Sequence, residues 1–396
     1  MPHYSEHLLH WGLDRQTVFL NHGAFGATPL PVLAQQTAYR NQLEAQPLRF
    51  FMRELEPLLH NAKAALADFV GADTHNIVFV KNATQGVNTI LHSLQPQSGD
   101  EWLLTNLNYG ACAETFKWYA RRQNIGLNTA QIPFPLTHED QIVAAIDAAI
   151  TPRTRLALID HITSASGIIL PVERIVRLLQ ARGIQVLVDG AHAPGMLPLQ
   201  LEALAADYYV GNCHKWICAP KGAALLYVRP DRQAQISPLQ ISHFHDKNQG
   251  TPQHWSDQFA MVGTDDYSAY LCVKTAIDWH TDLLPEGWSA VQKHNHDLAI
   301  AGRNLLLDRL GLPAAAPDSM IGNLATIPLT DSAPKAAYAY NYSEGLQDIL
   351  FYKYQIEVPI FRFPAAQPKQ WLRIAPQLYN DISQYEYLAQ ALLAEL

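Results

Sequence analysis

Short apolar runs alternate with longer amphipathic stretches between about residues 77 and 230. Short apolar runs bounded by polar residues predict strands, and the longer stretches between them predict helices. Regular alternation of the two is typical of βα units that build a mostly parallel sheet. We therefore expect an α/β fold, with strands at residues 77–80, 102–105, 156–160, 185–188, 208–211 and 223–228, and helices at 87–94, 111–123, 141–149 and 172–182.

The pattern changes after about residue 275. A long helical stretch covers residues 288–310, a Pro- and Ala-rich break follows at 311–317, and a mixed α/β tail completes the chain. At 396 residues the chain also exceeds the roughly 250–300 residues at which a single hydrophobic core stops growing. We expect a large domain over residues 21–278 and a smaller α+β domain built from residues 1–20 and 279–396.

Composition narrows the classes of partner. The formal net charge is −8, from 28 basic and 36 acidic residues, which argues against a nucleic-acid-binding or basic membrane-binding face. No apolar run reaches the roughly 18 residues of a spanning helix. The four cysteines form no CxxC pair, so reduced thiols and a cytoplasmic location are expected. Only 16% of residues are charged, below the usual roughly 25%, which predicts a large core and a buried partner interface.

Polar segments follow several of the predicted strands. Ligands of open α/β sheets bind outside the carboxyl ends of the strands, so these segments are candidate sites. The segment Lys-Asn-Ala-Thr-Gln-Gly at residues 81–86 precedes a predicted helix, and the backbone amides there suit a phosphate beside Thr84. The alternative is an ordinary helix cap by Thr84.

Two further strand ends carry a carboxylate and an amine. Asp189 follows the apolar run Val186 to Val188, and Lys215 lies between His214 and Trp216. A lysine in such company can be desolvated, which lowers its pKa and makes it a usable nucleophile. The alternatives are a capping aspartate and a surface lysine.

Together the three segments supply what a pyridoxal-phosphate site needs. These parts are a phosphate cup, a carboxylate for the pyridinium nitrogen and a lysine that can form a Schiff base. The chain contains no GxGxxG, GxxxxGK[ST], HExxH or GxSxG motif, so nucleotide, zinc-protease and hydrolase sites lack support. The histidine pairs at residues 243 and 245 and at 294 and 296 lack other ligand types, and no metal site is predicted.

The motifs carry a specific resemblance over nearly the whole chain. They are the segments at residues 20–26 (LNHGAFG), 82–86 (NATQG), 160–164 (DHITS), 188–192 (VDGAH), 214–216 (HKW), 263–266 (GTDD) and 372–375 (LRIA), with Tyr379-Asn380 after the last. With them the chain resembles the class V aminotransferase family of fold-type I pyridoxal-phosphate enzymes, and most of all its isopenicillin-N-epimerase-like branch. The resemblance implies a large domain with a mostly parallel seven-stranded sheet.

The resemblance also implies roles for individual residues. Lys215 would hold pyridoxal 5'-phosphate as a Schiff base, and Asp189 would pair with its pyridine nitrogen. Residues at the phosphate would be Ala83, Thr84, Asn212 and His214. Tyr109 would stack on the ring, and Ser164 and His192 would lie near its phenolic oxygen. Thr264 would reach the phosphate of the neighbouring subunit, which implies a homodimer.

For the substrate end, Asn21, His22 and Gly23 are candidate contacts, and Arg373 would grip the α-carboxylate, a task that suits a planar guanidinium. Arg362 is either a second anion contact or a solvated arginine. The resemblance implies an amino acid, or a small molecule that contains one, as substrate.

The reaction is less defined than the cofactor. An epimerase or racemase needs acid–base groups on both faces of Cα: Lys215 would serve one, and Tyr109, His22 or a water the other. No cysteine lies between residues 359 and 373, which argues against persulfide-forming desulfurases. Two alternatives stay open, a C–S lyase that acts on a cysteine conjugate and a non-catalytic binding protein that retains the fold.

Overall fold

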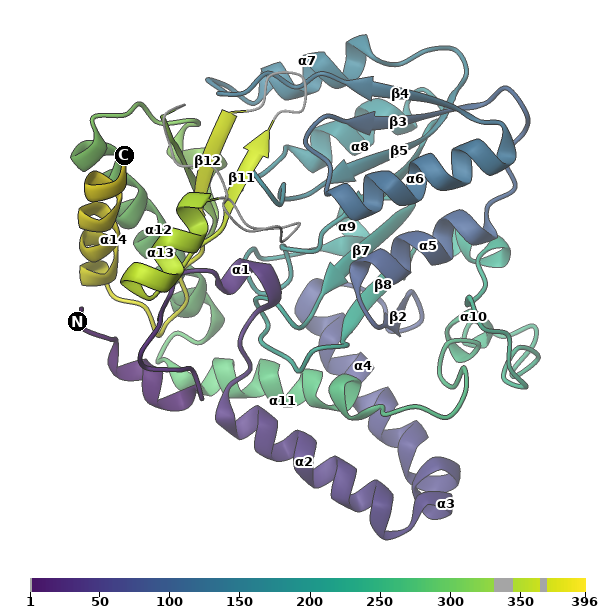
Figure 1. The fold of residues 1–396 in the computed structure, drawn as a ribbon. Helices are drawn as coiled ribbons and strands as arrows, with labels where there is room; N and C mark the ends of the chain where they lie inside the picture. The colour runs from purple at the N-terminus through teal and green to yellow at the C-terminus, as the bar shows by residue number, and fades with distance from the viewer. Residues whose placement is uncertain (1, 331–344, 364–368) are drawn as a thin grey trace.

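A seven-stranded sheet forms the centre of the molecule (Figure 1). The computed structural model describes residues 2–330, 345–363 and 369–396. The strands of the sheet are β2 (Ile77–Val80), β8 (Ala224–Val228), β7 (Tyr208–Asn212), β6 (Gln185–Asp189), β5 (Thr154–Asp160), β3 (Glu101–Thr105) and β4 (Gly126–Ala130), in that spatial order. Only β8 runs antiparallel to its neighbours in this sheet, so the predicted α/β fold with a mostly parallel sheet is confirmed.

The six strands predicted from apolar runs all form, with ends that shift by no more than two residues. The seventh, β4, carries the sequence Gly-Leu-Asn-Thr-Ala and was not predicted. It lies at the edge of the sheet, and most of its residues stay partly or fully exposed. An edge strand needs no continuous apolar run, which explains why the pattern did not show it.

Helices cover both faces of the sheet, as parallel strands require. On one face α5 (Ala83–Ser93) and α6 (Gly110–Gln123) pack against Leu187 and its neighbours. On the other, Val186 and Val188 face a core that includes α4 (Leu55–Val70), α7 (Asp140–Ala148), α8 (Val172–Gln180) and α11 (Ser268–Leu283). The alternating side chains of β6 thus enter two cores.

The C-terminal elements gather beside the N-terminus, at one side of the sheet (Figure 1). They are α12 (Trp288–Leu310), β9 (Ala325–Pro328), α13 (Gly345–Tyr354), β10 (Ile356–Glu357), β11 (Ile360–Phe363), β12 (Lys369–Ile374) and α14 (Ile382–Glu395). Strands β11, β12 and β9 form an antiparallel sheet, and β1 (Val18–Phe19) pairs with β10. This pairing joins segments near the two chain ends, and the small domain of residues 1–20 and 279–396 stays a prediction.

The remaining elements are short or lie at the periphery. They are the helices α1 (His22–Phe25), α2 (Leu30–Ala45), α3 (Pro47–Arg49), α9 (Leu201–Leu204) and α10 (His254–Asp257), the 3-10 helices η1 (Glu6–His10), η3 (Pro230–Gln235) and η4 (Asp318–Met320), and the π-helix η2 (Phe50–Glu54). No helix in the described ranges is long and apolar enough to span a membrane.

Candidate active site

The carboxyl ends of β5, β6 and β7 meet at a cavity of about 310 Å³. The start of α5 and the loop after β7 complete its walls. Nine of the ten residues predicted to bind the cofactor line this cavity: Ala83, Thr84, Tyr109, Ser164, Asp189, His192, Asn212, His214 and Lys215. Segments that lie far apart in the sequence thus meet where an open α/β sheet binds its ligands.

The amine of Lys215 is held as a neutral acceptor. Its Nζ lies 3.0 Å from Nε2 of His192, and Trp216 Nε1 donates to Nδ1 of the same ring over 3.4 Å. Because an indole nitrogen only donates, Nδ1 is the acceptor and Nε2 carries the proton. Lys215 therefore accepts from His192, as a neutral amine does.

Burial is the main reason that this amine is neutral. Burial and, to a smaller extent, the positive charge of Arg373 lower the pKa of Lys215 to about 7. A neutral amine retains the lone pair that attacks a carbonyl carbon.

We expect apoprotein to take up pyridoxal phosphate at a rate that rises with pH and levels off above about pH 8. Below its pKa of about 7 the Lys215 ammonium has no lone pair, and above it the amine is free. The rate of cofactor absorbance change, measured between about pH 5.5 and 9.5, tests this. A rate that still climbs at the upper end would indicate an ordinary lysine with a pKa of about 10.4.

Two buried carboxylates lie side by side on neighbouring strands. Asp160 ends β5 and stands in register with Asp189 at the end of β6, and both line the cavity. Asp189 Oδ1 accepts from the Ala191 amide at 3.0 Å, and the Oδ2 atoms of both Asp160 and Asp189 are buried without a partner among the described residues. Burial and the charge of Asp189 raise the pKa of Asp160 well above its usual range. Burial raises the pKa of Asp189 as well, so the pair readily holds a proton, which we assign to Asp160.

The opposite end of the cavity suits an anion. Helix α5 begins at Ala83, whose amide donates to Asn212 Oδ1 at 2.9 Å. The helix cap is Asn82, which accepts from the Gln85 amide, so the alternative of a cap by Thr84 is wrong. Thr84 instead lines the cavity in the first turn of the helix, where backbone dipoles favour negative charge.

Arg373 is a buried cation beside the cavity wall. Its side chain donates to the carbonyl of Ser164 and, over 3.3 Å, to Asn21 Oδ1. It forms no ion pair with described residues, and its Nε is buried without a partner there. Burial lowers its pKa to about 10, so it remains charged at neutral pH. An incoming carboxylate would satisfy this charge.

Apart from Asn21 and Arg373, four predicted site residues do not line the cavity. The buried His22 ring contacts the carbonyl of Lys215 at 3.0 Å and the Tyr379 hydroxyl at 2.8 Å, behind the cavity wall. Gly23 packs against Leu324 and Trp216, so neither of these two residues lines the cavity. Thr264 is exposed in the loop before α11, and Arg362 is exposed on β11. These positions favour a structural role for His22 and Gly23, behind the cavity wall, over contact with the substrate.

Other residues line the cavity but were not predicted from the sequence as site residues. Lys81 and Lys221 line the cavity, where Lys81 pairs with Asp265 and Lys221 donates to Thr28 Oγ1. Each lies next to a predicted segment, in Lys-Asn-Ala-Thr and in Pro-Lys-Gly, which was the available signal. Phe25 also lines the cavity although 74% of it is exposed. Only the fold brings its loop to this edge.

Gly26 lets the chain pass directly beside Lys215. Its φ of 70° and ψ of 162° lie in a region that is essentially limited to glycine. A Cβ at this position would lie 2.1 Å from the carbonyl oxygen of His214 and 3.0 Å from Cα of Lys215.

We expect Gly26→Ala to lower the free energy of unfolding by about 2 kcal/mol or more and to reduce cofactor content. Urea unfolding and the absorbance of bound cofactor measure the two effects. Gly311→Ala is the control, because Gly311 has a φ of 65° but open space around its Cβ. Equal losses in both variants would show that contact with the Lys215 segment is unimportant.

The residues present fit pyridoxal phosphate. The unpartnered Oδ2 of Asp189 is an acceptor for a pyridinium N–H, and the neutral amine of Lys215 can bond to an aldehyde carbon. The first turn of α5 offers a phosphate the positive end of the helix dipole and the side chain of Thr84, which lines the cavity. Asp189, Lys215 and the start of α5 thus each match one part of the cofactor.

Comparisons with known proteins agree with this fit. The family model described as aminotransferase class-V matches residues 18–335. Isopenicillin N epimerase of Streptomyces clavuligerus is 32% identical over 392 residues, which cover 96% of this chain and 95% of that protein. A probable chloroplastic L-cysteine desulfhydrase of Arabidopsis thaliana is 27% identical over 398 residues, covering 94% and 82%.

Solved structures share the fold. A complex of the cystine C–S lyase C-DES with its product cysteine persulfide has a TM-score of 0.78 and 22% identity, with 96% of this chain and 97% of that chain covered. An apo cysteine desulfurase from Thermococcus onnurineus NA1 has a TM-score of 0.78 and 18% identity, covering 97% and 95%. Together with the family model and the geometry of Lys215 and Asp189, this shows that the chain belongs to the class V aminotransferase family of pyridoxal-phosphate-dependent enzymes.

Proposed function

We propose that this enzyme removes the Cα proton of an amino acid, or of a small molecule that contains one, and returns it with inversion. The observation that carries the proposal is the buried neutral amine of Lys215, held by His192 in a cavity that also contains Asp189. The 32% identity to isopenicillin N epimerase supports the epimerase assignment.

The position of each residue in the cavity determines its proposed role. Bound pyridoxal phosphate supplies an electron sink for the bond that breaks at Cα. Asp189 would keep the pyridine nitrogen protonated, and Arg373 would hold the substrate carboxylate. Lys215, once its amine is released, would remove the Cα proton on one face when one epimer reacts, and would donate a proton on that same face when the other epimer reacts. The His192 ring, fixed by Trp216, orients this amine.

Inversion needs a proton donor on the second face, and we assign it to Tyr109. Its side chain lines the cavity and is 45% exposed, at the N-terminus of α6. A backbone hydrogen bond to Asp160 holds this residue in place. His22 is less suited, because both of its ring nitrogens contact protein groups behind the cavity.

Exchange in deuterated water tests the proposal. The holoenzyme is incubated with a panel of L- and D-amino acids and peptides with an amino-acid terminus, and Cα deuterium and optical rotation are followed. An epimerase incorporates deuterium and inverts Cα, and Tyr109→Phe should suppress inversion more than exchange on the Lys215 face. Formation of a keto acid without inversion would overturn the epimerase assignment.

A C–S lyase is the second candidate. The relatives include L-cysteine desulfhydrases and the hercynylcysteine sulfoxide lyase of Schizosaccharomyces pombe. Elimination shares Cα proton removal with epimerisation and differs by a leaving group on Cβ. Release of pyruvate and a sulfur-containing product from a cysteine conjugate would favour it. All four cysteines are buried, so none is placed to receive sulfur as a desulfurase requires. Membership of an enzyme family leaves the alternative of a non-catalytic binding protein without support.

We also propose a cytoplasmic homodimer in which Thr264 reaches the partner's phosphate site. Thr264 is exposed, and the neighbouring Asp265 pairs with Lys81 at the rim of the cavity. Exposed apolar side chains, among them Phe25, Leu48 and Ile241, would be covered by a second copy. Sedimentation as a monomer at working concentration would contradict the dimer. Four unpaired, buried thiols fit a reducing compartment.

A further inference from the structure

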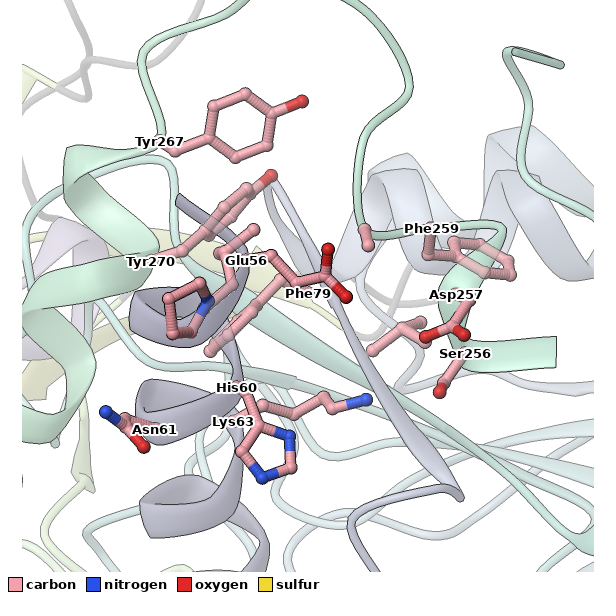
Figure 2. A pocket seen from close by; sticks show the side chains of 14 residues that line it. Glu56, His60, Asn61, Lys63, Phe79, Ser256, Asp257, Phe259, Tyr267 and Tyr270 are labelled. Carbon is pink, nitrogen blue, oxygen red and sulfur yellow. The ribbon is translucent and has the colours of Figure 1, made fainter. Parts of the chain in front are cut away.

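A second and larger cavity lies outside the cofactor site. Its volume is about 450 Å³, within the range of small-molecule sites. It opens between α4, β2, the segment around α10 and the start of α11 (Figure 2). The lining residues that matter here are Lys63, Phe79, Asp257, Phe259, Tyr267 and Tyr270.

Aromatic rings form much of its wall. Phe79 and Tyr270 stack with ring centroids 5.0 Å apart and an interplanar angle of 12°, so they present a rigid flat surface. Tyr267 packs edge-on to Tyr270, with centroids 6.1 Å apart. Figure 2 shows Phe259 on the opposite side of the space from these rings. A flat apolar group would bury its area between such walls.

One cation points into this apolar space. Lys63 extends from α4 toward the side that carries Ser256 and Asp257 (Figure 2). Its half-buried amine forms no hydrogen bond or ion pair with any residue that the structure describes. Asp257 and Asp73 attract it from beyond contact distance, while burial lowers its pKa.

The nearby carboxylates already have partners. Glu56, at the rim, pairs with Lys247 at 2.8 Å. Asp257 accepts from Asn248 Nδ2 at 2.5 Å. Among these three charged residues, Lys63 is therefore the one that forms no hydrogen bond or ion pair with a described residue, and it can donate to a ligand.

We propose that this pocket binds a small carboxylic acid with an aromatic body, its ring between the aromatic walls and its carboxylate on Lys63. No relative's name and no part of the cofactor chemistry assigns a ligand here. The site borders the proposed dimer contact, because Tyr267 donates to the carbonyl of Gly263 at 2.8 Å, next to Thr264. A bound acid would thus touch the segment that carries Thr264.

Binding of 3-phenylpropionate to the holoenzyme tests the proposal. This probe has no amine or carbonyl that could react at Lys215. We expect saturable binding by calorimetry with a Kd of about 1 mM, as the size of the probe allows. The neutral analogue 3-phenylpropan-1-ol should bind about five-fold more weakly, since it lacks the charge. Equal binding of the alcohol would overturn the role of Lys63.

Two variants place the binding at this pocket. Lys63→Gln should weaken binding of the acid about five-fold, and Ala260→Trp, which fills the cavity without changing charge, should abolish it. Lys293→Gln, at an exposed helix position, is the matched control. No binding to the holoenzyme, as when a second copy fills the pocket, or unchanged binding in both pocket variants would refute the proposal.

Discussion

Lys215→Ala should eliminate the covalently held cofactor and lower turnover by about 10⁴-fold or more. The amine lies at 3.0 Å from His192 in a buried site, and it is the nucleophile and the base of the proposed reaction. Wild-type holoenzyme should lose its visible absorbance on borohydride treatment and retain the reduced cofactor through denaturation. In the variant, pyridoxal phosphate should wash out on dialysis after the same treatment.

Lys221→Ala is the control for this change. Lys221 lines the same cavity, but its amine donates to Thr28 Oγ1, whereas the amine of Lys215 accepts from the His192 ring. The Lys221 variant should therefore keep a covalently reducible cofactor, whatever its affinity for the phosphate. Covalent attachment that survives in Lys215→Ala and disappears in Lys221→Ala would move the Schiff-base lysine to residue 221.

The central sheet was predictable because each buried parallel strand is apolar on both faces. Val186, Leu187 and Val188 form a continuous apolar run that enters two cores, and the run ends at Asp189. The edge strand β4 lacks that constraint and left no signal. Part of the loop before Arg373, residues 364–368, lies outside the described ranges.

The site residues on strand ends were also predictable, whereas those on connecting loops were not. Asp189 and Lys215 follow strands, so their place at one sheet edge follows from the topology. The position of His22 depends on how α1 docks behind Lys215, a tertiary contact between residues 193 positions apart. No local pattern encodes that contact, and the resemblance alone made His22 a substrate residue.

The pairing of Asp160 with Asp189 is a second feature of the site that the sequence alone does not predict. The sequence shows Asp160 and Asp189 as two strand terminators of equal standing. Only the register of β5 on β6 places them side by side. Burial raises the pKa of both carboxyls there, and the charge of Asp189 raises the pKa of Asp160 further. We assign the proton to Asp160, which leaves Asp189 as the charged acceptor for the cofactor nitrogen.

Asp189→Asn should leave the cofactor bound through Lys215 but slow Cα proton loss by about 10³-fold. An amide cannot hold the pyridine nitrogen protonated, so the ring accepts electrons less readily. Deuterium exchange at Cα, measured under single-turnover conditions, reports this step directly. Cofactor absorbance and its loss with borohydride should stay close to wild type, which separates the effect from a failure to bind.

Asp160→Asn is the matched control, since it changes the same side-chain type on the neighbouring strand. Asn resembles the protonated carboxyl that we assign to Asp160, and its amide can still serve the contact with Asn108, now 3.1 Å from Asp160 Oδ1. Exchange in this variant should remain within about tenfold of wild type, because no catalytic charge is removed. If Asp160→Asn were the slower variant, the cofactor nitrogen would pair with Asp160, and the proton would reside on Asp189.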